Sequence, residues 1–138
     1  MTIDLQALCE NARTLKDLAG PRSTMAVVKA DAYGHGAVPC ARALSPQVDA
    51  FAVAITEEAI ALRDAGIDLP ILVLQGPHSR EDVKLMSSAA LWPAISGDHQ
   101  IDWLEQADAQ FEQVWLKCDT GMHRLGFMPQ EIAPAWSR

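Results

Sequence analysis

The chain has 138 residues, of which 49% are hydrophobic and 21% are charged, and its formal net charge at pH 7 is −7. These proportions are those of an ordinary globular protein, and the acidic balance without any run of Lys and Arg argues against binding to nucleic acid or to an anionic membrane. No apolar run approaches the roughly 20 residues that cross a bilayer, and the N-terminus lacks the pattern of a signal peptide, so we expect a cytoplasmic protein.

Metal and disulfide chemistry have little support in the sequence. Cys9, Cys40 and Cys118 are odd in number and widely spaced, which fits neither a disulfide framework nor a zinc site. No pair of histidines and carboxylates has the spacing of metal ligands, so we expect no metal.

The first half of the chain predicts helices and strands in alternation. Leucines and alanines between residues 5 and 19 recur at spacings of three and four, which indicates an amphipathic helix with Asp4 as its N-cap and Gly20-Pro21 at its end. Further elements are expected as a strand over 24–29, a helix over 38–44, a strand over 49–54, and a helix that Thr56 caps and that ends at Gly66.

The second half continues the same alternation. The patterns predict strands over 70–74, 91–95 and 113–117, helices that begin at Ser79 and Asp98, and a helix starting within 129–136. Pro93 weakens the middle strand because proline lacks an N–H for the ladder. Close alternation of strands and helices indicates an α/β fold with a parallel sheet, but periodicity does not distinguish a barrel from an open sheet.

Lys29 is the most informative residue because it ends a predicted strand. A buried ammonium without a partner is rare, whereas a desolvated lysine can act as an imine-forming nucleophile. Tyr33, Gly34 and Gly36 follow at once, and glycines let the backbone turn sharply near a ligand. Functional residues of parallel βα proteins lie at the carboxyl ends of strands, and Val27 shares the face of Lys29. A plain strand-to-helix loop is the alternative on composition alone.

Two longer strings carry a family resemblance. Val-Val-Lys-Ala-Asp-Ala-Tyr-Gly-His-Gly, residues 27–36, resembles the pyridoxal phosphate attachment site of the alanine racemases, and residues 116–127 resemble that family's second signature. The opening Ile3-Asp4-Leu5, with Leu8 and Asn11, is similar to its first helix. The resemblance implies a (β/α)8 TIM barrel, which needs about 250 residues. Residues 1–138 are therefore expected to be about its first five βα units, truncated, with the family's C-terminal β-domain absent.

The resemblance also implies roles for individual residues. Lys29 would bind pyridoxal 5′-phosphate covalently and then act as the base toward the Cα proton on one face of alanine. Tyr33 would hydrogen-bond the cofactor phosphate, and Arg124 would donate to the cofactor's phenolic oxygen. Arg124 and Met122 would also lie on the substrate side, where the backbone of Met122 helps to hold the alanine carboxylate.

Lys117 corresponds to a lysine that is often carbamylated in the family, and a carbamate would pair with Arg124. The alternative is an unmodified lysine that faces solvent or Asp119. Asp31 and Asp119 lie in the two motifs, and we expect them to orient backbone rather than to transfer protons.

The activity that the resemblance implies is an isomerase reaction, the pyridoxal phosphate-dependent interconversion of L-alanine and D-alanine, which supplies D-alanine for cell-wall peptidoglycan. The full-length protein would be a homodimer, and its opposite-face base would be a tyrosine from the partner's second domain. Because Tyr33 is the only tyrosine here, residues 1–138 alone are expected to be inactive. The alternatives are a racemase of serine or another small amino acid, a non-catalytic barrel protein that binds the cofactor, and an inactive truncated product.

Overall fold

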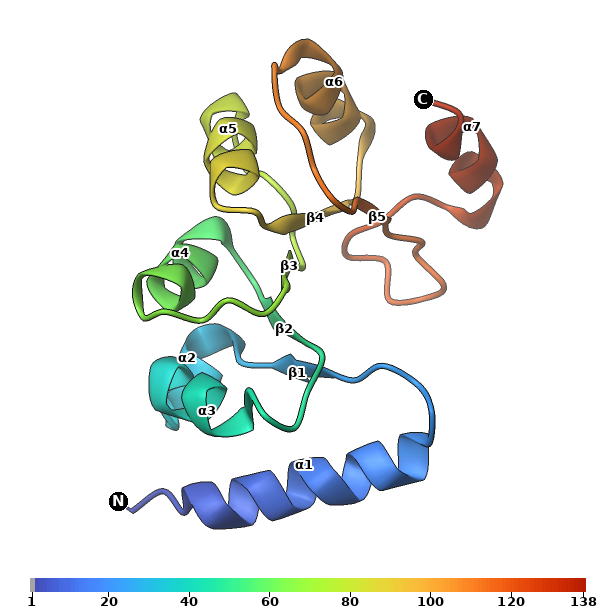
Figure 1. The fold of residues 1–138 in the computed structure, drawn as a ribbon. Coiled ribbons are helices and arrows are strands. Elements are labelled where there is room, and N and C mark those ends of the chain that lie inside the picture. Colours follow the sequence, from blue (N-terminus) through green and yellow to red (C-terminus); the bar gives the residue numbers. More distant parts are fainter. Residues whose placement is uncertain (1) are drawn as a thin grey trace. The chain divides into compact units, whose positions relative to one another are not determined.

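The computed structural model describes residues 2–138, which form two compact α/β units. The first unit extends to Leu72 and the second runs from Val73 to Arg138. Figure 1 shows the helices and short strands in chain order, and each unit is described by itself.

The first unit begins with a long helix and continues with parallel βα units. Its elements are α1 (Leu5–Ala19), β1 (Met25–Val27), α2 (Lys29–Gly34), α3 (Ala37–Leu44), β2 (Ala50–Val53), α4 (Thr56–Asp64) and the start of β3 (Ile71–Val73). Strands β1 and β2 pair in parallel, with Met25 opposite Ala50 and Val27 opposite Ala52. Every residue of β2 is buried, as expected for a strand that is covered on both faces.

The ends of α1 confirm the predicted helix. The Asp4 carboxylate accepts hydrogen bonds from the backbone N–H groups of Gln6 and Ala7 at 2.9 and 3.0 Å, and Gly20 ends the helix with φ of 64°. Helix α1 packs against α3 (Figure 1), and the Cys9 thiol donates to the Ala43 carbonyl at 3.3 Å. The capping carboxylate and the left-handed glycine are the signals that defined this helix in the sequence.

The second unit repeats the alternation. Its elements are the end of β3, then α5 (Arg80–Ser88), β4 (Trp92–Ile95), α6 (Asp98–Gln106), β5 (Trp115–Leu116), the 3-10 turn η1 (Pro129–Glu131) and α7 (Ile132–Trp136). Strands β4 and β5 pair in parallel, with Ala94 opposite Trp115. Ile95 of β4 belongs to a buried hydrophobic cluster with Ile101, Phe127 and Ala135.

Several local expectations need correction. The strands are shorter than predicted, and β1 ends at Val27, so Lys29 is the first residue of α2 rather than the last of a strand. Thr56 is not a cap: Ile55 takes the N-cap position, and the Thr56 hydroxyl is buried without a hydrogen-bond partner. Pro93, expected to weaken its strand, is accommodated within β4.

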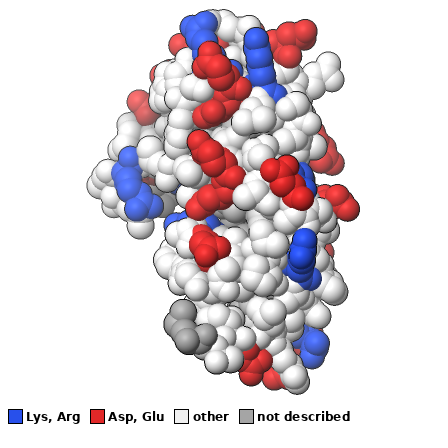
Figure 2. All heavy atoms as spheres, turned by 90° about the vertical axis from the view of Figure 1, so that its left-hand side faces the viewer, with Lys and Arg blue, Asp and Glu red and all other residues white. Residues whose placement is uncertain are grey.

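Acidic side chains outnumber basic ones on the face drawn in Figure 2, where both kinds are interspersed among uncharged residues. Across residues 2–138 no helix is long and apolar enough to cross a membrane. The same residues contain no group of three or more His, Cys, Asp or Glu side chains that could hold a metal ion.

Candidate active site

Lys29 lies at the carboxyl edge of the β1–β2 pair. The ladder extends one residue beyond β1, because the Val28 N–H donates to the Ala52 carbonyl at 2.9 Å. Val28 is buried at 3% exposure, whereas Lys29 is half-buried and Val27 is 52% exposed. Within the described residues, the Lys29 amine forms no hydrogen bond or ion pair. The edge of the sheet therefore presents a lysine whose amine has no protein partner and is available to a ligand.

A left-handed helical turn follows this lysine. Residues 30–33 have φ between 51° and 55° and ψ between 39° and 47°, although none of them is glycine. Left-handed dihedrals cost L-residues about 1–2 kcal/mol each, so four in succession need strong local support. The Ala32 N–H donates to the Val28 carbonyl at 2.9 Å, and the Gly36 N–H donates to the Asp31 carbonyl at 3.0 Å.

Two carboxylates support the turn at its ends. Glu58 of α4 accepts from the Ala30 N–H at 2.7 Å, and Asp31 accepts from the Ala37 N–H at 2.6 Å, at the start of α3. Asp31 thus bonds to backbone, as expected. The sequence does not reveal the hydrogen bond between Glu58 and the Ala30 N–H. A glutamate in the first turn of a helix is common because it interacts favourably with the helix dipole, so its presence there indicates no further partner.

Tyr33 ends the left-handed run and is 70% exposed. Its phenol forms no hydrogen bond to another described residue. The neighbouring His35 donates from Nδ1 to the Ala32 carbonyl at 2.8 Å, which gives this histidine a structural role in the turn. The segment from Lys29 to Gly36 therefore offers one amine and one phenol to solvent from a tightly bonded backbone.

The other predicted residues lie in the second unit, on the loop between β5 and α7 (Figure 1). This loop closes on itself: the Phe127 N–H donates to the Lys117 carbonyl at 2.9 Å, and the Asp119 N–H donates to the Phe127 carbonyl at 2.8 Å. Gly126 has φ of 120°, and a Cβ atom there would lie 2.9 Å from the Asp119 nitrogen. Only glycine fits this closure without displacing backbone.

Asp119 organises the loop interior. Its Oδ1 accepts from the backbone N–H groups of Gly121 and His123 at 2.9 and 3.0 Å, and its Oδ2 lies 3.1 Å from Nδ1 of His123. These hydrogen bonds, first that from Gly121 and then that from His123, lower the pKa of the Asp119 carboxyl from its ordinary value. Asp119 therefore orients backbone, as predicted.

Lys117, Met122 and Arg124 present their side chains from this framework. Lys117 is half-buried, whereas Met122 is 77% exposed and Arg124 is exposed. Neither the Lys117 amine nor the Arg124 guanidinium forms a hydrogen bond or ion pair with another described residue. In particular, Lys117 does not pair with Asp119, whose oxygens bond to Gly121 and His123.

We expect the loop to be sensitive to acid. Because the pKa of Asp119 is lower in the folded loop than its ordinary value of 3.8, its carboxylate stabilises the loop above about pH 4. That contribution is lost as pH falls through the folded pKa. The amide NMR shifts of Gly121 and His123 should report one common titration with a pKa below 3.8. Titration of both amides at or above the ordinary value would contradict this account, and Asp119→Asn should remove the titration.

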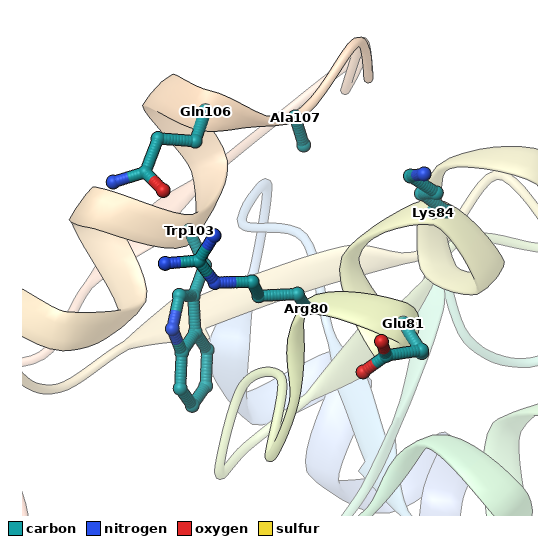
Figure 3. Close-up of a pocket in the computed structure, with 6 residues that line it drawn as sticks. All are labelled: Arg80, Glu81, Lys84, Trp103, Gln106 and Ala107. Carbon is teal, nitrogen blue, oxygen red and sulfur yellow. The ribbon is translucent and has the colours of Figure 1, made fainter.

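A hollow elsewhere in the second unit does not belong to this site. Figure 3 shows it between α5 and α6, where the Arg80 side chain extends toward the indole of Trp103. Glu81, Lys84, Gln106 and Ala107 complete its lining, and none of the predicted site residues contributes to it.

These observations define the class of the protein: a parallel α/β protein with an available lysine at the edge of its sheet. A family model described as the alanine racemase N-terminal domain matches residues 3–138. The chain belongs to this family. An alanine racemase of Xanthomonas oryzae pv. oryzae is 49% identical over 142 residues, and the match covers 99% of this chain and 37% of that relative. The catabolic alanine racemase of Pseudomonas aeruginosa is 46% identical, and the match covers 99% of this chain and 38% of that relative.

Solved structures agree with the sequence relatives. The alanine racemase of Acinetobacter baumannii superposes with a TM-score of 0.89 at 33% identity, covering 98% of this chain and 41% of that one. The biosynthetic alanine racemase of Pseudomonas aeruginosa gives a TM-score of 0.85 at 38% identity, and the match covers 97% of this chain and 37% of that one. The predicted α/β fold, matching the first part of a TIM barrel of this family, is thereby confirmed. The chain spans little more than a third of the length of these relatives.

Proposed function

We propose that this chain is the N-terminal portion of the cofactor-binding barrel of a pyridoxal phosphate-dependent enzyme that interconverts L-alanine and D-alanine. The observation that supports it most is Lys29, a half-buried amine without a protein partner, directly before a left-handed turn at the carboxyl edge of parallel strands. Strained backbone of this kind is concentrated at functional sites. Membership of the family supplies the reaction.

The donor set fits the proposed cofactor. Pyridoxal phosphate carries an anionic phosphate and a phenolic oxygen, which need donors and cations, and an aldehyde, which needs an amine. Lys29 offers the amine, Tyr33 a hydroxyl that is 70% exposed, and Arg124 a guanidinium that the described residues leave unpaired. When bound, the cofactor supplies an electron sink that acidifies the Cα–H bond of an amino acid.

The residues of this chain would divide the remaining work. The Lys29 amine binds the cofactor and handles the Cα proton on one face of alanine, where a positioned base accelerates proton transfer. Tyr33 donates to the phosphate, and Arg124 holds negative charge on the phenolic oxygen by charge-assisted hydrogen bonds. The Met122 backbone, on the same exposed loop as Arg124, would help to hold the substrate carboxylate.

Properties of the whole protein are proposed on the same basis. Inversion needs a second group on the opposite face of Cα, which we assign to a tyrosine of the partner subunit in a homodimer, outside the part of the family that this chain matches. The product D-alanine would serve cell-wall peptidoglycan, and we place the reaction in the cytoplasm.

The test of this function is an assay of the protein as its gene encodes it. L-alanine is supplied, and its inversion is monitored as the formation of D-alanine. L-serine is the comparison substrate, because a racemase specific for serine would favour it over alanine. We expect inversion of alanine at a higher kcat/KM than of serine, dependent on added cofactor. Cofactor binding without inversion of either amino acid would instead favour a non-catalytic binding protein.

We further propose that Lys117 is carbamylated. Its amine has no protein partner within residues 2–138, and a carbamate there would hold Arg124 by hydrogen bonds worth about 1.5–3 kcal/mol each. Lys117→Ala is therefore expected to reduce kcat/KM by about tenfold or more, and acetate should partly restore it by occupying the vacated space. An unchanged rate, or a loss that acetate cannot rescue, would contradict the carbamate.

A further inference from the structure

We propose that Glu58 is a positioning residue for Lys29, an inference that rests on the proposed function. Glu58 lies in the first turn of α4, and its hydrogen bonds within the described residues go to backbone N–H groups rather than to the lysine amine. It acts on the backbone that carries Lys29, through the next residue along the chain.

The Glu58 carboxylate joins the ends of two neighbouring strands. Its Oε1 accepts from the Ala30 N–H at 2.7 Å, directly after Lys29. Its Oε2 accepts from the Ala54 N–H at 2.7 Å, and from the Ile55 N–H at 3.4 Å, directly after β2. Because β1 and β2 run in parallel, both sets of N–H groups lie at the same edge of the sheet. One side chain thus bridges the backbone segments that follow the two paired strands.

A carboxylate is needed for this bridge because both of its oxygens accept. The amide of a glutamine has one accepting oxygen, so its NH2 group would face either Ala30 or Ala54 and leave that N–H without a partner. At Ala54, where the bond is partly buried, such a loss costs more than the bond itself because the abandoned donor stays partly desolvated, whereas the bond at Ala30 is exposed. The neighbouring Glu57 carries the same charge in the same turn but is exposed, and no described residue bonds to its carboxylate.

The position of Ala30 makes this bond consequential for the site. Ala30 is the first residue of the left-handed run, with φ of 52°, and its dihedrals set the direction in which the chain leaves Lys29. The Asp31 carboxylate joins the run to the start of α3 through the Ala37 N–H, whereas Glu58 is the side chain that bonds to the first residue of the run. Without it, Ala30 can relax toward ordinary dihedrals and displace the lysine. Displacements of about 1 Å can cost two orders of magnitude in reactivity.

Glu58→Gln tests this inference, with Glu57→Gln as the control that removes the same charge one residue away. Pyridoxal 5′-phosphate is titrated into the protein as its gene encodes it, and the visible band of the lysine-bound cofactor is recorded. We expect half-saturation to need about tenfold more cofactor in Glu58→Gln, as for loss of one hydrogen bond to a charged acceptor, and no change in Glu57→Gln. Hydrogen exchange without cofactor should accelerate at residues 30–36 in Glu58→Gln alone.

Equal cofactor affinity in the two variants would overturn the inference. So would faster exchange throughout β2, where Phe51 and Val53 are fully buried, because Glu58 would then support the fold as a whole rather than the lysine. Failure of the proposed function gives a different result: the unsubstituted protein would form no lysine-bound cofactor. In that case, accelerated hydrogen exchange at residues 30–36 in Glu58→Gln would still show that Glu58 stabilises this backbone segment.

Discussion

Replacement of Lys29 by alanine is expected to abolish the visible band of the bound cofactor and to reduce alanine racemisation by at least about 10³-fold. The proposed site uses this amine twice, as the covalent attachment point and as the base on one face of Cα. General acid–base catalysis alone contributes about 10²–10⁴-fold. Absorbance spectra with added cofactor, and the rate of D-alanine formation, measure the two effects separately.

Lys84→Ala is the matched control, because Lys84 is an exposed lysine in α5 and is not among the predicted site residues. It should retain the band and the rate. The account of Lys29 would be contradicted if Lys29→Ala kept a borohydride-reducible adduct, or if both variants lost activity to the same extent.

The second large effect concerns residues 1–138 produced alone. We expect no net inversion of L-alanine by this stretch, because the proposed mechanism needs a proton acceptor and a proton donor on opposite faces of Cα, and Tyr33 is the only tyrosine present. Tyr33 is assigned here to the cofactor phosphate. Exchange of the alanine α-proton in deuterated water can be measured separately from inversion. Exchange without inversion would indicate that a base acts on only one face of Cα.

The same stretch is expected to self-associate. Val27 and Trp115 are 52% and 41% exposed on strands, and β5 pairs with β4 alone among the described strands, which leaves unpaired backbone groups along its other edge. Sedimentation velocity measures this association. Robust inversion by monomeric residues 1–138 would contradict the assignment of the opposite-face base to another part of the protein.

The elements with explicit end signals could be predicted from the sequence. Helix α1 has both the Asp4 cap and Gly20, and α5 begins where the Ser79 hydroxyl accepts from the Asp82 N–H at 3.2 Å. The predicted strands are longer than the observed ones because apolar runs continue past the last paired residue. The residue type of Thr56 favours the N-cap position, whereas the backbone geometry places Ile55 there.

The least predictable feature is the left-handed turn after Lys29. Ala30, Ala32 and Tyr33 have no preference for left-handed dihedrals, so no local signal marks them. The turn is held by hydrogen bonds to Asp31 and to Glu58, which is 28 residues from Ala30 along the chain. A sequence pattern can place a lysine near a strand end, but it does not contain the long-range contact that fixes the backbone beside it.

The central claim is that Lys29 is the residue to which the cofactor binds, and one measurement tests it most directly. The protein as its gene encodes it is loaded with pyridoxal 5′-phosphate, reduced with borohydride, digested and analysed by mass spectrometry. The account predicts one stoichiometric pyridoxyl adduct, on Lys29. An adduct on Lys16, Lys84 or Lys117 in its place, or no adduct at saturating cofactor, would contradict it.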